Sequence, residues 1–407
     1  MPVPAAPLRL NDLVHPVVAG LISVIVNYGG TFILVFQAAR VAGLSPALTA
    51  SWVWSVSIGV GVTGLVLSWR YRAPIITAWS TPAAAFLVTA LATTPYAEAI
   101  GAYMISAAAF VVLGLSGCFE RVIRLIPPGI ASGLLAGILL QFGIGAFRGA
   151  SVDPVLVGLL IVVYLALKRF SARYAVVGIL VLGLGVLLMQ GRGDLAGLRL
   201  EFAVPVFTRP DFSLTATLSV ALPLFLITLT GQYMPGLLVL RNDGFRTSAN
   251  PIVTVTGLGS LIMAPFGSHA FNIAAITAAI ATGREAHEDP SRRWIAGIAA
   301  GGFYVLVGVF GVTLAAVFMA LPATFITTLA GLALLGTIGG SLAGALADPA
   351  SREAALITFL ASAANITLLG IGGAFWGLVI GLIASFLLNG RFPRRARAGL
   401  PAGEGAS

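Results

Sequence analysis

The sequence predicts an all-α polytopic membrane protein with about 14 transmembrane helices in two inverted repeats of seven. Hydrophobic residues make up 58% of the 407 residues, charged residues only 9%, and the mean hydropathy is +1.01. An ordinary soluble domain carries about 25% charged residues. The apolar residues form long runs, and the basic residues alternate between the two membrane sides that these runs define.

Each span needs about 20 mostly apolar residues, so the chain has room for about 14. The predicted spans are 14–38, 46–68, 74–91, 96–117, 127–147, 153–168, 174–191, 213–239, 249–263, 269–283, 293–317, 321–346, 352–369 and 372–389. The predicted regions are an N-terminal tail (1–12), a first repeat (13–191), a periplasmic loop (192–212), a second repeat (213–390) and a basic, disordered C-terminal tail (391–407).

The basic residues predict the orientation. With both termini on the cytoplasmic side, 18 of the 23 Lys and Arg residues lie there. This bias follows the positive-inside rule, so we expect a protein of the bacterial inner membrane with both termini in the cytoplasm. The net charge of +9 is then a consequence of topology, and no nucleic-acid partner is expected. Each repeat has seven spans, an odd number, so the second repeat starts on the opposite side of the membrane from the first. The second repeat must therefore be inverted relative to the first.

Reactive side chains are sparse. Cys118 is the single cysteine, and the three histidines, His15, His269 and His287, are scattered. No intrachain disulfide, metal site or cofactor is therefore expected. A nucleophile elbow and a phosphate-binding loop are also missing from the sequence, which argues against an enzyme.

Two segments at matching places in the repeats are predicted to be broken. An offset of 191 residues aligns Ala73-Pro74 with Ala264-Pro265 and Thr81 with Asn272, in the third and tenth spans. Thr and Asn are N-cap residue types, and Pro82 suits a first helical position. Each segment is therefore expected to run extended and then to start a helix inside the membrane. The alternative interpretation is that both segments are ordinary helices kinked by proline, with no ligand bound there.

Such half-helix starts favour an anion, because their free N–H groups and dipoles are positive. Of the fourteen acidic residues, only Glu98 falls within a predicted span, near its periplasmic end. A membrane centre without fixed negative charge suits an anionic substrate better than a cation.

Polar and aromatic side chains around the breaks are the candidate site, although hydrogen bonding between helices is the commoner role for such groups. His269, as a group that titrates near pH 6.5, is also the predicted proton-coupling residue. The predicted substrate-binding residues are Tyr28, Trp79, Ser80, Thr81, Gln232, Tyr233, His269, Phe271 and Asn272.

Four runs of the sequence carry a family resemblance: ITAWSTP at 76–82, SVALPLFL at 219–226, IAAITAAI at 273–280 and LAGLALLGTIGGS at 329–341. They resemble the benzoate/proton symporter family of the BenE type. The resemblance extends from about residue 10 to residue 390. It implies import of benzoate or a similar aromatic carboxylate together with a proton.

The layout more distantly resembles uracil permease and the nucleobase–ascorbate transporters. That resemblance implies a core domain of spans 1–4 and 8–11 and a gate domain of spans 5–7 and 12–14. Uracil permease-like proteins carry acidic residues in the eighth and tenth spans, where this chain has Gln232 and His269. The difference argues against a nucleobase substrate.

Alternatives to the aromatic-carboxylate symporter remain open at this point. They are a transporter of the same fold for another organic anion or a nucleobase, and a passive anion facilitator. The expected partners are the small carboxylate, a proton and the lipid bilayer, and the sequence is compatible with a homodimer.

Overall fold

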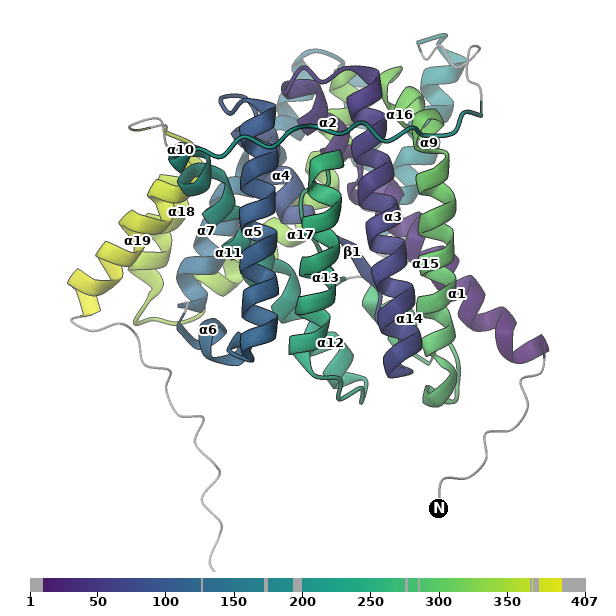
Figure 1. Ribbon diagram of the computed structural model, residues 1–407. Helices are drawn as coiled ribbons and strands as arrows, with labels where there is room; N and C mark the ends of the chain where they lie inside the picture. The colour runs from purple at the N-terminus through teal and green to yellow at the C-terminus, as the bar shows by residue number, and fades with distance from the viewer. Residues whose placement is uncertain are drawn as a thin grey trace, which may run out of the picture.

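The apolar runs form helices that pack side by side (Figure 1). This computed structural model describes residues 10–125, 127–171, 175–192, 200–274, 277–284, 286–366, 368 and 373–389. Among these residues, seven helices are long and apolar enough to cross a membrane, and counting the bent pair Pro290–Val309 and Gly311–Val317 as one span makes eight. The chain is therefore a mostly helical, membrane-type protein. The number of 14 spans stays a prediction, because the remaining helices are shorter.

The elements follow the predicted order. The first half contains α1 (Leu10–Thr31), α2 (Ile33–Val41), α3 (Pro46–Tyr71), β1 (Thr77–Trp79), α4 (Thr81–Ala90), α5 (Tyr96–Ser116), α6 (Phe119–Leu125), α7 (Pro128–Arg148), η1 (Gly149–Ser151), α8 (Pro154–Ser171) and α9 (Ala175–Met189). The second half contains α10 (Leu214–Ala216), η3 (Thr217–Ala221), α11 (Leu222–Thr228), η4 (Leu229–Tyr233), α12 (Met234–Asn242), α13 (Ala249–Met263), η5 (Ala264–Phe266), β2 (Phe271–Ile273), α14 (Ala278–Thr282), η6 (Pro290–Arg292), α15 (Trp294–Val309), α16 (Gly311–Met319), α17 (Ala323–Leu346), α18 (Arg352–Ala363) and α19 (Gly373–Asn389).

Two groups of helices pack mainly within themselves. In one group, α3 packs against α15 and α16, α5 against α13, and α1 against α15. In the other, α7 packs against α17 and α18, α18 against α19, and α8 against α9. Glycine allows close approach in the first group, since a Cβ on Gly61 of α3 would lie 2.7 Å from the carbonyl oxygen of Gly301 on α15. Small residues serve this purpose in membrane helices.

Two short strands interrupt the helical pattern at the centre of the protein, so the fold is not purely α-helical. β1 pairs with β2 in antiparallel fashion, and Ala78 lies opposite Asn272. The pairing continues beyond the strands, because the Ser80 N–H donates to the Ala270 carbonyl and the Ala274 N–H to the Ile76 carbonyl, both at 2.8 Å. Extended backbone inside a membrane needs such partners, and here the two segments provide them for each other.

The helix starts near these strands differ from the sequence prediction. Ser80, rather than Thr81, is the N-cap of α4, and its hydroxyl accepts a hydrogen bond from the Ala83 N–H at 3.4 Å. Asn272 does not begin a helix, because its backbone lies within the strand pair and α14 starts only at Ala278. Pairing with β1 takes precedence over the capping preference of the Asn side chain.

An extended segment crosses one end of the protein (Figure 1). It belongs to the predicted loop 192–212 and begins at Leu200. The N–H of Val206 donates to the Ser51 hydroxyl at 2.9 Å, and the N–H of Thr208 donates to the Pro265 carbonyl at 2.7 Å. These bonds tie the segment to α3 and η5.

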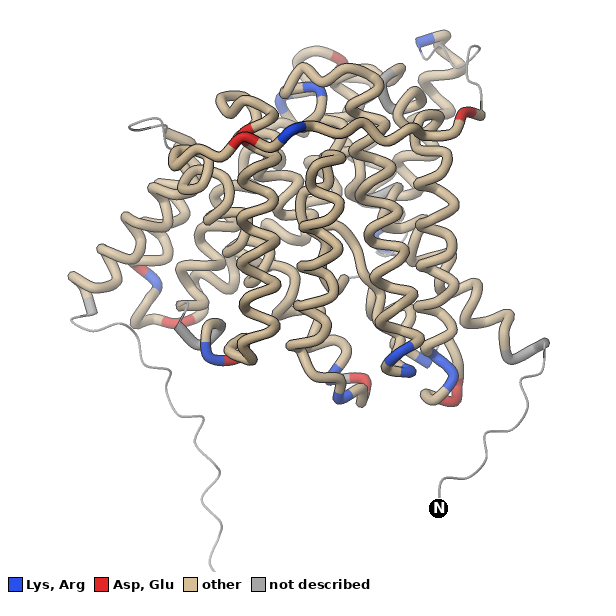
Figure 2. The backbone as a smooth tube through the Cα atoms, viewed as in Figure 1, with Lys and Arg blue, Asp and Glu red and all other residues tan. Residues whose placement is uncertain are grey.

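The opposite end holds the start of α1 and the end of α19. Many of the basic residues gather there (Figure 2). The start of α1 takes in residues 10–12 of the predicted N-terminal tail. The predicted C-terminal tail, 391–407, lies outside the described residues.

Candidate functional site

A cavity of about 760 Å³ lies between the two groups of helices. Pockets of this size hold small organic ligands. Its described lining residues are Val26, Asn27 and Thr31 of α1, Ala78 and Trp79 of β1, Thr81 and Pro82 of α4, Gly231 and Gln232 of η4, Pro235 of α12, Ala274, Thr277, Ile280, Gly283 and Arg284 in and around α14, Tyr164 and Lys168 of α8, Val176 and Val177 of α9, and Ala333, Leu334, Gly336 and Thr337 of α17.

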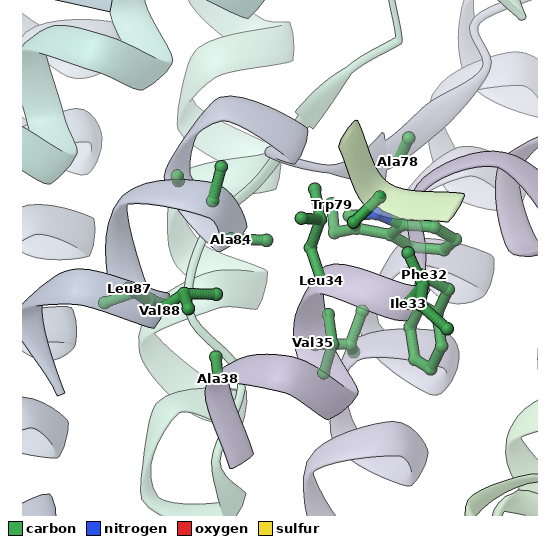
Figure 3. Close-up of a cluster of buried hydrophobic side chains, with 14 of the residues drawn as sticks. Phe32, Ile33, Leu34, Val35, Ala38, Ala78, Trp79, Ala84, Leu87 and Val88 are labelled. Atoms are coloured by element: carbon green, nitrogen blue, oxygen red, sulfur yellow. The ribbon is translucent and has the colours of Figure 1, made fainter. Parts of the chain in front are cut away.

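Trp79 lines this cavity although it is only 1% exposed, and its neighbours fix its ring. Its Nε1–H donates to the Thr31 hydroxyl at 3.2 Å. Its ring lies 4.6 Å from that of Phe32 and 5.1 Å from that of Tyr28, measured between ring centroids. Figure 3 shows Trp79 above Phe32 within the surrounding apolar cluster. A fixed indole face suits the ring of an aromatic ligand.

The N-terminus of α4 also reaches the cavity. The Ala83 N–H is taken by Ser80, and Pro82 has no N–H, so the backbone donor left at this terminus is that of Thr81. The Thr81 hydroxyl lies 3.3 Å from the hydroxyl of Thr31. A helix N-terminus of this kind attracts negative charge.

Thr277 adds a buried hydroxyl to the opposite strand segment. It lies just before α14, lines the cavity and is only 1% exposed. Its Oγ1 atom has no hydrogen-bond partner among the described residues. Buried polar atoms are nearly always satisfied, so this hydroxyl is available to a ligand or water. The sequence prediction did not include it, although Thr277 is the one polar residue in the run 273–280.

The charges around the cavity are all positive among the described lining residues. Lys168 and Arg284 are exposed and line it, whereas no Asp or Glu belongs to this set. Glu98, the acidic residue of a predicted span, instead accepts a hydrogen bond from the Ser213 hydroxyl. Sequence analysis counted Lys168 and Arg284 only among the 18 basic residues of the cytoplasmic side, although Lys168 lies in the last turn of α8 and Arg284 follows α14.

Three of the nine predicted site residues line the cavity. They are Trp79, Thr81 and Gln232. Gln232 lies in η4, a wide π-helical turn just before Pro235, and such turns are frequent at functional sites.

Tyr28, Ser80 and Tyr233 lie behind the lining. Tyr28 packs on Trp79 and shares a hydrogen bond with Ser57. The Ser80 hydroxyl caps α4, and the Tyr233 hydroxyl pairs with that of Thr256 at 2.6 Å. These side chains position the lining.

His269, Phe271 and Asn272 are buried on the β2 segment and are not part of the described lining. The Nδ1 atom of His269 accepts a hydrogen bond from the Trp52 indole N–H at 3.1 Å. The Phe271 ring fills the space left by Gly59 and Gly259. The Asn272 side-chain amide donates to the Ile273 carbonyl at 2.8 Å.

Comparison with known proteins identifies the family. The family described as benzoate membrane transport protein matches residues 12–387. The chain belongs to this family. It is 42% identical over 383 residues to inner membrane protein YdcO of Escherichia coli, covering 94% of this chain and 98% of the relative. It is 41% identical over 371 residues to the benzoate membrane transport protein of Acinetobacter baylyi, covering 91% and 94%. The resemblance to the BenE-type family is confirmed.

Solved structures show the fold of this benzoate transport family member. The transmembrane domain of the cyanobacterial bicarbonate transporter BicA matches with a TM-score of 0.58 at 15% identity, over 94% of this chain and 99% of that one. The structure of SLC26A9 matches with a TM-score of 0.66 at 12% identity, over 94% and 66%. The chain therefore has the fold of these proteins, and its family is one of membrane transport proteins.

Proposed function

We propose that this chain is a secondary active transporter that imports benzoate or a similar aromatic carboxylate together with a proton. The observation that carries the proposal is the central cavity, which combines an indole wall, a helix N-terminus, an unpartnered hydroxyl and two cations. The named function of the Acinetobacter baylyi relative supports the substrate class. The absence of acidic groups from the described lining argues against a cationic substrate.

The proposal includes the predicted architecture. We place 14 spans in two inverted repeats within a bacterial inner membrane, with both termini in the cytoplasm. The core domain then contributes α1, β1, α4, η4, α12 and α14 to the cavity, and the gate domain contributes α8, α9 and α17. A substrate site at such a boundary is what alternating access requires.

The carboxylate is proposed to bind at the Thr81 N–H, with the hydroxyl of Thr277 as a further donor. The Thr31 hydroxyl is not such a donor, because it already donates to the Asn27 carbonyl. The N–H groups around Asn272 are a poorer choice than the sequence suggested, because that backbone pairs with β1. The ring lies against Trp79, with Gln232 nearby. Tyr28, Ser80, Tyr233, Phe271 and Asn272 shape the site from behind.

The contribution of Thr277 is testable by removing its hydroxyl. Thr277→Val keeps the side-chain shape, and we expect benzoate affinity to fall about threefold to tenfold, since a hydrogen bond contributes about 0.5–1.5 kcal/mol. Isothermal titration calorimetry on purified protein measures the change. Thr89→Val is the control, because its hydroxyl bonds the Phe86 carbonyl of its own helix and does not line the cavity. Equal affinities in wild type and Thr277→Val would remove this hydroxyl from the site.

A proton is needed because a lone carboxylate would enter against the membrane potential. Moving one charge across 100 mV costs about 2.3 kcal/mol. His269 is the proposed carrier, since it is the histidine buried beside the strand pair. The substrate carboxylate itself is the alternative carrier.

His269→Gln separates these two carriers. We expect the variant to lose accumulation driven by a pH gradient while it still exchanges labelled for unlabelled benzoate. Both are measured in proteoliposomes, and the retained exchange shows that the protein is folded. Accumulation with wild-type dependence on the pH gradient would mean that the proton travels with the carboxylate.

A substrate panel tests the function itself. Purified protein in liposomes with an acidic exterior is expected to concentrate benzoate and not uracil. Without the pH gradient, benzoate should only reach equal concentrations inside and outside the liposomes. Equilibration under both conditions would indicate a passive facilitator, and uptake of uracil in place of benzoate would overturn the substrate assignment.

A further inference from the structure

Two cations from different groups of helices line the cavity. Lys168 lies in the last turn of α8, and Arg284 follows α14. We infer that they form a second anion-binding position, a mouth site, that receives the substrate carboxylate between the inner site and the cytoplasm. This inference rests on the proposed function and concerns the path of the same substrate.

Lys168 is held at the cavity wall by a neighbour. Its Nζ atom donates to the Tyr164 hydroxyl at 3.2 Å and lies 5.2 Å from the centre of the Tyr164 ring. Tyr164 itself lines the cavity and is only 5% exposed. One buried side chain therefore keeps the ammonium group at the cavity wall, although the lysine itself is exposed.

Arg284 belongs to a loop that a second arginine fixes. Arg293 is 6% exposed, and its guanidinium donates to the carbonyls of Thr282 and His287, each at 2.7 Å. A third bond reaches the Glu288 carbonyl at 3.3 Å. Because these bonds span residues 282–293, they hold the backbone on both sides of Arg284.

Two nearby acidic side chains among the described residues are engaged elsewhere. The Asp243 carboxylate accepts a hydrogen bond from the Thr282 hydroxyl. The Asp289 carboxylate accepts bonds from the Ser291 N–H at 2.9 Å and the Ser291 hydroxyl at 2.8 Å. Neither Lys168 nor Arg284 has an ion pair with a described residue. Their positive charge is thus available to an anion.

The mouth site and the inner site lie on one path. Thr277 and Arg284 flank the two ends of α14, so helical rise separates them by roughly 10 Å. The buried, unpartnered hydroxyl of Thr277 marks the inner end of this path. A carboxylate leaving it meets the two cations before it reaches water, which lowers the barrier to release and raises the local anion concentration for rebinding.

The mouth site predicts an effect on one side of the membrane only. The test is benzoate exchange in proteoliposomes with oriented protein, measured from each side. For Lys168→Gln combined with Arg284→Gln, we expect the KM on the cytoplasmic side to rise about tenfold and the KM on the other side to stay unchanged. A rising salt concentration should raise the cytoplasmic KM of the wild type more than that of the double variant, because salt screens exposed charges. Arg169→Gln is the control, an exposed neighbouring cation outside the lining.

The outcomes separate the two proposals. Wild-type protein that exchanges no benzoate would overturn the proposed function, and the mouth site with it. Normal wild-type exchange with an unchanged cytoplasmic KM in the double variant would overturn the mouth site alone. An equal rise of KM on both sides would also overturn it, because it would indicate general damage to the fold.

Discussion

Gly336→Leu is expected to reduce benzoate uptake by about 10-fold to 100-fold without unfolding the protein. Gly336 lines the cavity on α17, and a Cβ added there meets no atom within 4 Å. The leucine side chain therefore enters space that the substrate needs, and overpacking of this kind costs about 1–3 kcal/mol. Leucine is also a better helix former than glycine, so α17 itself is not weakened.

The same helix provides a matched control. A Cβ on Gly339 likewise meets no atom within 4 Å, but Gly339 does not belong to the described lining. Gly339→Leu should leave uptake unchanged, and both variants should elute as the wild type does in gel filtration. Wild-type uptake by Gly336→Leu would show that the substrate does not pass through this cavity.

Replacement of Trp79 is expected to have the second large effect. Trp79→Phe keeps a ring but loses the hydrogen bond to Thr31, and we expect benzoate affinity to fall about tenfold. Trp79→Ala removes a side chain that is 1% exposed, so it should also lower the free energy of unfolding by about 3–5 kcal/mol. The phenylalanine variant is therefore the informative one. Affinity is measured by calorimetry, and stability by thermal unfolding.

Trp54→Phe controls for the loss of an indole. Trp54 packs on Phe266 at a centroid distance of 5.9 Å and does not line the cavity. The Trp54→Phe variant should bind benzoate with the affinity of the wild type. If Trp79→Phe expresses normally and binds with unchanged affinity, Trp79 is not part of the substrate site.

The membrane character and the two extended segments could be predicted from local sequence. Ala73-Pro74 and Ala264-Pro265 disfavour a continuous helix at these places, and the structure has β1 and β2 just beyond them. The pairing of Ala78 with Asn272 is a contact across 194 positions, and no local pattern specifies its register. Asn272 was for that reason expected at a helix start.

The cavity lining was harder to predict than its location. Composition near the breaks pointed to Trp79 and Thr81, which do line it. Polarity alone cannot distinguish a lining residue from one facing a neighbouring helix, and Tyr233 lies on the latter side with its hydroxyl on Thr256. Lys168 and Arg284 were missed because their basic charge already had an explanation in topology.

A structure determined with bound benzoate tests the central claim most directly. The account predicts the carboxylate within hydrogen-bonding distance of the Thr81 N–H or the Thr277 hydroxyl, with the ring against Trp79. Benzoate bound outside this cavity, or inside it with its carboxylate far from both donors, would contradict the account.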